Sequence, residues 1–324
     1  MSRAMRMERT GGPEVLIWTE TDVVEPGPGQ VGIRHTAIGV NYIDVYHRTG
    51  VYPLPLPATP GVEGVGVVVS VGAGVDGLKV GDRVAYAGGA PGAYSEHRVL
   101  DAARALRLPD AIGDEQAASG LFSGLTARFL LRDVYRVASD DVVLIHAAAG
   151  KVGLLMCQWA RHLGATVIGT VGSEAKAAVA AEHGCRFPIV YTRDNVPEAL
   201  LRATGGAKAH VVYDSVGKDT FADSLDCLRP KGMLVSFGVA SGETPPLDLR
   251  LLLAKGSLFV TRPSFGHYMG ETGAYRAAAQ ELFGLVTDGT LTFPTGQRFA
   301  LKDAAAAHRA LEERRTTAAT ILVP

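Results

Sequence analysis

The residues from Asp141 to Gly153, DVVLIHAAAGKVG, join a run of apolar β-forming residues directly to a glycine-punctuated segment. The run 142–145 suits a parallel strand that is covered on both faces. Gly150 and Gly153 let a helix begin close to that strand, and its amino end supplies N–H groups and a partial positive charge. This arrangement is typical of a dinucleotide-binding loop, although the spacing Ala147-x-x-Gly150-x-x-Gly153 is a variant of the usual pattern.

The segments after Ser119 alternate between strand and helix patterns. An apolar helix is predicted over 151–162, a strand over 165–171 and an alanine-rich helix that ends near Glu182. Further strands are predicted over 187–190, 209–214, 232–237 and 257–261. The alternation predicts an α/β fold with a doubly wound, six-stranded parallel sheet.

The segments before residue 120 follow a different pattern, with short β-type runs at 31–35, 65–69 and 82–86 separated by Gly and Pro. Such a pattern is typical of a compact, barrel-like β domain. The tail contains predicted helices over 272–287 and 303–313 and a strand over 320–323. We expect it to return to the first domain, which gives one domain from 1–123 plus 265–324 and an inserted domain from 124–264.

The composition narrows the classes of partner. With 32 basic and 33 acidic residues the formal charge is -1, which gives no electrostatic reason to expect nucleic acid as a partner. The three cysteines are widely spaced, which argues against a disulfide framework or a structural zinc cluster. No apolar run reaches the length of a membrane span. We therefore expect a soluble cytoplasmic protein with a small-molecule substrate and no membrane partner.

Several motifs in order carry a resemblance to a known family. They are GVNYID at 39–44, GVEG at 61–64, VGDRV at 80–84, GAYSE at 92–96, GLT at 124–126, VYDSVG at 212–217, SFG at 236–238 and TRPS at 261–264. With them the chain resembles the medium-chain dehydrogenases, and within these the NADPH-dependent quinone oxidoreductases related to zeta-crystallin. The resemblance implies a Rossmann sheet inserted into a GroES-like β-barrel domain, and reduction of a quinone by hydride transfer from NADPH.

Zinc is not expected in the site. Zinc-dependent relatives have a cysteine and a histidine at the positions of Asn41 and Val62. Valine offers no lone pair, and asparagine is a poor zinc ligand. We therefore predict a reaction without a metal ion.

The choice of dinucleotide follows from the end of the second strand of the inserted domain. An NAD site usually has an acidic residue there, about 20 residues after the glycine loop, whereas this chain has Val171. The following Gly172, Ser173 and Lys176 suit a 2′-phosphate, which favours NADPH. By resemblance, the phosphate is held by Lys176, Tyr191 and Arg314. Glu174 would repel it, so we expect that side chain to point to solvent.

The resemblance also assigns the remaining site residues. The pyrophosphate loop comprises Ala149, Gly150, Lys151, Val152 and Gly153, and the family usually has glycine in place of Lys151. This lysine either contacts a phosphate or is a solvated first-turn residue. Asn41, Tyr46, Tyr52 and Thr126 are expected around the nicotinamide and the acceptor, with Ser215, Phe237 and Gly238 also on the cofactor.

Tyr46 and Tyr52 are catalytic candidates because a hydroxyl donor stabilises the negative charge that develops on the acceptor oxygen. Asn41 is the third catalytic candidate. Packing in a proline-rich loop is the alternative for Tyr52, and stabilising a turn before a short helix is the alternative for Asn41. No role is assigned to His35, His97, His146 or His267, and Cys157 is expected in the core.

Two other functions stay open: an alkenal or enone reductase, and a dinucleotide-binding redox sensor or RNA-binding protein without significant turnover. A homodimer is expected through the segment Ser257 to Thr261, if it forms a sheet edge with unpaired backbone groups.

Overall fold

The computed structural model of the protein describes residues 1–293, 295–313 and 315–324. The chain divides into two units. Unit 1 comprises Met1–Leu125, Met269–Gly289 and Phe293–Pro324, and unit 2 comprises Thr126–Tyr268 and Thr290–Thr292. The chain thus leaves unit 1, builds most of unit 2 and returns. The boundaries at 125/126 and 268/269 fall within the helices α2 (Asp114–Phe129) and α8 (Phe265–Met269). The assignment of one unit to substrate and the other to cofactor stays a prediction.

The main sheet of unit 1 has the strand order β14-β15-β3-β4-β5-β7, with β6 also paired to β3. Its pairs are antiparallel except for β14 and β15, which are parallel. The strands are β3 (Gln30–Val40), β4 (Glu63–Val71), β5 (Arg83–Ala87), β6 (His97–Asp101), β7 (Leu106–Arg107), β14 (Gln297–Ala300) and β15 (Thr320–Val323). The last strand therefore completes the sheet that the first part of the chain begins.

Unit 1 also contains a separate two-stranded sheet, formed by β1 (Ser2–Arg6) and β2 (Ile17–Thr21), and the helices α1 (Tyr42–Thr49), α9 (Thr272–Thr287) and α10 (Ala304–Glu312). Its core joins apolar side chains of the main sheet to the start of α10. The fully buried members include Ile33, Val68, Leu322, Ala304 and Ala307. Two distant parts of the chain therefore stabilise one core.

Unit 2 is built on a six-stranded parallel sheet of order β10-β9-β8-β11-β12-β13. The strands are β8 (Val142–Ile145), β9 (Thr166–Val171), β10 (Phe187–Val190), β11 (Ala209–Asp214), β12 (Leu228–Ser236) and β13 (Phe259–Thr261). This order, in which the chain starts in the middle and winds outward in both directions, is that of the Rossmann fold, as predicted.

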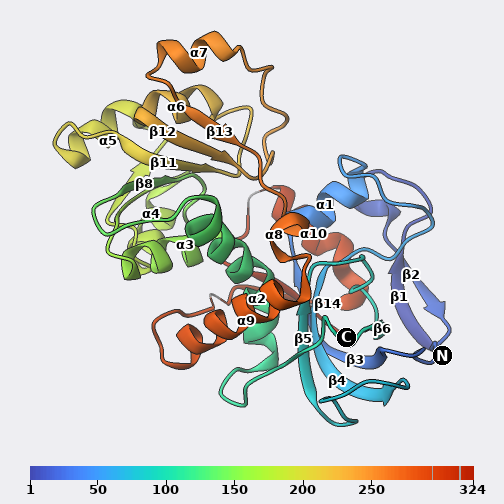
Figure 1. Cartoon of the computed structure of the whole chain (residues 1–324). Helices are drawn as coiled ribbons and strands as arrows, with labels where there is room; N and C mark the ends of the chain where they lie inside the picture. Colours follow the sequence, from blue (N-terminus) through green and yellow to red (C-terminus); the bar gives the residue numbers. More distant parts are fainter. Residues whose placement is uncertain (294, 314) are drawn as a thin grey trace. The chain divides into compact units, whose positions relative to one another are not determined.

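Helices cover both faces of the unit 2 sheet. Figure 1 shows α3 and α4 on one face and α5 and α6 on the other, and these helices contact neighbouring strands. The helices are α3 (Lys151–His162), α4 (Glu174–Glu182), α5 (Val196–Thr204), α6 (Phe221–Cys227) and α7 (Leu249–Ala254), and a π-helical turn spans Leu130–Val134. Connecting helices of this kind are what parallel strands require.

A row of aligned apolar residues crosses the sheet of unit 2. Ile168, Leu144, Val212 and Leu234 lie opposite one another on four adjacent strands, and all four are fully buried. They share a core with Leu200 of α5 and Leu225 of α6. This packing fixes the strand register and so aligns the carboxyl ends of the strands. Among the described residues, no helix is both long and apolar enough to cross a membrane.

Candidate functional site

The loop between β8 and α3, residues 146–150, brings the helix very close to the strand. Gly150 is the N-cap of α3. A Cβ atom on Gly153 would lie 2.4 Å from the carbonyl oxygen of Ala147, which no side chain can tolerate. The first-turn N–H groups of a helix have no carbonyl partner within that helix. The loop therefore has the geometry of a pyrophosphate cradle. Lys151 is the first residue of α3, and its contact with phosphate stays a prediction.

The residues that end or follow the adjacent strands β9 and β10 contact one another. Val171, the last residue of β9, accepts a hydrogen bond from the N–H of Tyr191 at 3.1 Å. The Tyr191 hydroxyl lies over Gly172, 2.8 Å from where a Cβ of that glycine would be. Ser173 is the N-cap of α4, and its hydroxyl accepts the N–H of Lys176 at 3.3 Å. The structure thus gathers the four described residues that were expected around a 2′-phosphate, whereas Arg314 lies outside the described residues.

Glu174 is exposed, as expected, and it forms an ion pair with Arg193. The same guanidinium contacts the Asp194 carboxylate at 2.9 Å. The sequence analysis missed Arg193, which follows the end of β10 by three residues. The signal that could have identified it is a basic residue just after β10, because β10 lies beside β9 and Gly172 follows β9. Arg193 offsets part of the negative charge of Glu174, which would otherwise repel a phosphate at this turn.

The ends of β11 and β12 contribute two more packed segments. Phe237 donates its N–H to the carbonyl oxygen of Asp214 at 2.8 Å. A Cβ on Gly238 would lie 2.7 Å from the carbonyl oxygen of Ser215. Ser215, Phe237 and Gly238 are therefore adjacent, at the carboxyl ends of the parallel strands. In open α/β sheets this is the edge where ligands bind.

In unit 1, Asn41 is the N-cap of α1. Its N–H donates to Asp44 Oδ2 at 2.9 Å, and its side-chain Nδ2 donates to Glu63 Oε2, also at 2.9 Å. Glu63 is fully buried and accepts the Phe122 N–H at 2.6 Å. Asn41 therefore stabilises the start of the helix, which was one of its two expected roles. Its catalytic role stays a prediction.

These contacts also test whether zinc fits here. The Asn41 amide presents its NH₂ group to Glu63, and Val62 is a buried apolar residue. Neither provides the sulfur or nitrogen donor that a zinc site requires. In the described part of the chain, no three His, Cys, Asp or Glu side chains are grouped so that they could hold a metal ion. The residues do not fit a catalytic zinc.

Tyr46 and Tyr52 lie together in unit 1. Their ring centroids are 5.1 Å apart with an interplanar angle of 61°, and Tyr42 packs on Tyr46 at 5.3 Å. The Tyr52 N–H also donates to the Tyr46 carbonyl oxygen at 3.1 Å. Edge-to-face packing of this kind fixes the ring orientations. The remaining expected residue, Thr126, is buried in α2 as the first residue of unit 2.

Comparison with known proteins identifies the family. Residues 27–110 match the alcohol dehydrogenase GroES-like domain, and residues 152–283 match the zinc-binding dehydrogenase domain. A quinone oxidoreductase of Pseudomonas aeruginosa is 50% identical to this chain, with 100% of both proteins covered. The chain belongs to the quinone oxidoreductase family. This membership confirms the fold class predicted from the sequence.

Two further relatives of this chain have names that refer to different reactions. The structure of Escherichia coli quinone oxidoreductase complexed with NADPH is 45% identical and has a TM-score of 0.97, covering 99% of this chain and 100% of its own. A 2-haloacrylate reductase of a Burkholderia species is 43% identical, covering 100% of this chain and 99% of its own length. Relatives at similar distance thus carry names with different substrates.

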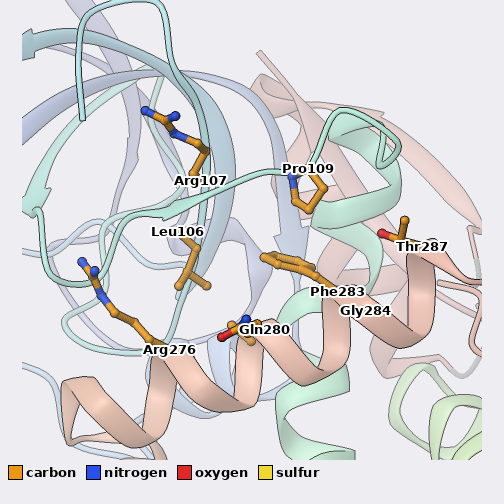
Figure 2. Close-up of a pocket in the computed structure, with 9 residues that line it drawn as sticks. Leu106, Arg107, Pro109, Arg276, Gln280, Phe283, Gly284 and Thr287 are labelled. Atoms are coloured by element: carbon orange, nitrogen blue, oxygen red, sulfur yellow. The ribbon is translucent and has the colours of Figure 1, made fainter. Parts of the chain in front are cut away.

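A groove of about 460 Å³ lies elsewhere in unit 1, along α9. Figure 2 shows Phe283 and Pro109 within it and Arg107 and Arg276 at one side. Arg107 is already paired with Asp82 at 2.6 Å. None of the residues expected in the site lines this groove.

Proposed function

We propose that this protein catalyses the NADPH-dependent reduction of quinones without a metal ion. The observation that carries the proposal is the end of β9, where Val171 replaces the acid that would bind a ribose 2′-hydroxyl. Tyr191 and Lys176 lie at the same turn, and Arg193 offsets part of the Glu174 charge. These features favour a 2′-phosphate.

Three groups of residues in unit 2 would hold three parts of the cofactor. The first turn of α3, with Ala149, Gly150, Val152 and Gly153, would hold the pyrophosphate. Gly172, Ser173, Lys176 and Tyr191 would hold the 2′-phosphate. Ser215, Phe237, Gly238 and Thr126 would hold the remainder of the dinucleotide.

NADPH supplies a hydride, so the protein needs no nucleophile for the reaction. Its task is to position the acceptor and exclude water. The hydroxyls of Tyr46 and Tyr52 would donate to the acceptor oxygen as negative charge develops there. The quinone becomes a hydroquinone by taking one hydride from NADPH and one proton. That proton comes from solvent, so no dedicated acid or base is required.

A reductase of activated alkenes is the second candidate, because a 2-haloacrylate reductase is 43% identical to this chain. Such an enzyme delivers hydride to a β-carbon and protonates the α-carbon. A comparison of a panel of quinones with a panel of alkenals and 2-haloacrylates decides between the two candidates.

The test is NADPH oxidation in the presence of small ortho- and para-quinones, with and without a chelator. We expect turnover that the chelator does not change and that exceeds the rate with NADH. An absence of turnover with every quinone would refute the proposal. Measured NADPH binding with no turnover on either panel, together with filter binding of RNA, would support the non-catalytic alternative.

A cytoplasmic homodimer is part of the same proposal. β13 forms an edge of the unit 2 sheet, and its Phe259 is 57% exposed. On α7, Leu249 and Leu253 are exposed as well. A second copy that pairs with this edge would cover both the backbone groups and the apolar side chains.

A further inference from the structure

A chain of buried polar side chains runs beneath the carboxyl ends of the unit 2 strands. His146 directly follows β8, and its Nδ1 lies 2.9 Å from Thr170 Oγ1 on β9. Its Nε2 lies 3.0 Å from Ser224 Oγ on α6. All three residues are at most 2% exposed. A histidine in such a place must have both ring nitrogens satisfied by the protein.

Asp214, at the end of β11, is the last member of this series of hydrogen-bonded side chains. The Ser224 hydroxyl donates to Asp214 Oδ2 at 2.9 Å. The other carboxylate oxygen accepts the N–H groups of Val216 at 2.8 Å and Gly217 at 3.0 Å. The carboxylate thereby holds the loop 215–217, which contains Ser215.

The direction of every hydrogen bond in the chain follows from these contacts. A carboxylate only accepts, so Ser224 uses its one proton on Asp214. Ser224 must then accept from His146, which places the ring proton on Nε2. The bare Nδ1 accepts from the Thr170 hydroxyl. Burial lowers the pKa of His146, which keeps the ring in this neutral form.

We propose that His146 is a positioning residue for the dinucleotide. Through Ser224 and Asp214 it fixes the loop 215–217, and through Thr170 it ties the end of β9 to the end of β8. The inference rests on the proposed function, because it assumes that the dinucleotide binds at this edge. It gives a role to a histidine that the sequence analysis left without one.

The test compares His146→Leu with His146→Gln and Ser224→Ala. Leucine cannot donate to Ser224, whereas the glutamine amide can. Loss of one buried hydrogen bond of this kind weakens binding by about tenfold. We expect His146→Leu and Ser224→Ala to raise the Kd and KM for NADPH by about that factor while kcat stays within about twofold, and His146→Gln to recover most of the loss.

The matched control is His35→Leu, since His35 is also buried and doubly hydrogen-bonded but lies in unit 1, with Ser95 and Tyr86 as partners. It should lower the thermal unfolding temperature without changing the Kd for NADPH. Circular dichroism shows which variants are folded. If His146→Leu does not fold, Ser224→Ala carries the test in its place. The inference is overturned if folded His146→Leu or Ser224→Ala protein binds NADPH normally, or if the Gln and Leu variants are equally impaired.

Measuring the Kd by NADPH fluorescence separates this inference from the proposed function. If the unsubstituted protein binds NADPH but reduces no quinone, the proposed function fails while the Kd values of the variants still decide the positioning role. If it binds no NADPH, both fail.

Discussion

Lys176 is the residue whose proposed role is most specific, because only the 2′-phosphate distinguishes NADPH from NADH. We expect Lys176→Ala to raise the Kd for NADPH about tenfold, as loss of a charge-assisted hydrogen bond does, and to leave the Kd for NADH nearly unchanged. Fluorescence titration with each nucleotide checks this. The exposed Lys302, in unit 1, provides the control as Lys302→Ala. An equal effect on both nucleotides would refute the phosphate role.

The ion pair between Arg193 and Glu174 makes a second prediction at the residue scale. Both side chains are more than 60% exposed, so the effect is small. Arg193→Ala leaves the Glu174 charge unpaired and should raise the Kd for NADPH about threefold. Adding Glu174→Gln to that variant should restore the affinity. If the double variant binds as weakly as Arg193→Ala, Glu174 does not repel the phosphate.

Two buried histidines of unit 1 make stability depend on pH. Burial is the largest cause that lowers the pKa of His35 to about 3 and that of His308 to about 3, from an ordinary value of 6.5. Between about pH 6.5 and pH 3 the unfolded chain therefore binds more protons than the folded protein, so stability falls as the pH falls through this window. Each histidine contributes a slope of up to about 1.4 kcal/mol per pH unit.

Urea denaturation at pH 7, 6 and 5 measures this slope. We expect His308→Gln to lower the slope of the unfolding free energy against pH by up to about 1.4 kcal/mol per pH unit, the contribution of one histidine. His267 is exposed, so His267→Gln should leave the slope unchanged. The same slope in the unsubstituted protein and in His308→Gln would contradict the assignment.

At the scale of elements, two helical glycines are predicted to respond oppositely to alanine. Gly284 in α9 has nothing within 4 Å of where its Cβ would be, so Gly284→Ala should raise the free energy of unfolding by about 0.5–1 kcal/mol. Gly153 in α3 has the Ala147 carbonyl oxygen at 2.4 Å, so Gly153→Ala should lower both stability and NADPH affinity. Chemical denaturation of the two variants compares them directly, and a change of the same sign in both would be inconsistent with the loop geometry.

Elements with strong local patterns could be predicted from the sequence. The helices 151–162 and 272–287 and the strands 187–190 and 209–214 have the predicted limits. β14 was missed because Gln297–Ala300 has no apolar run, and its pairing with β15 arises from the fold of the unit. The sequence also placed the site loops at strand ends, since the topology of a parallel sheet brings those ends to one edge.

The contacts between side chains of different strands could not be predicted in the same way. Arg193 reaches Glu174 because β10 lies beside β9, and His146 reaches Ser224 because α6 packs near the end of β8. Such contacts depend on strand order and register, which no local pattern contains. Residues that act through neighbours distant in sequence are therefore the part of the site that the structure adds.

At the scale of the whole molecule, the proposed homodimer is open to direct measurement. Light scattering at micromolar concentration should give twice the mass of one chain. Phe259→Glu on β13 should produce a monomer, because it would bury a charge at the new contact. Val80→Glu replaces another exposed apolar residue, in unit 1, and should leave the dimer intact. A monomer in the unsubstituted protein would remove this part of the proposal.

The position of β15 has a consequence for synthesis on the ribosome. β15 lies between β14 and β3, and its Leu322 and Thr320 pair with Ile38 and Val40. All six strands of unit 2 precede it in the chain. While the chain is being translated, residues 38–40 of β3 therefore stay open to wrong partners until residues 320–323 emerge, although unit 2 can already be complete. The unit that begins first is the one that can finish folding last.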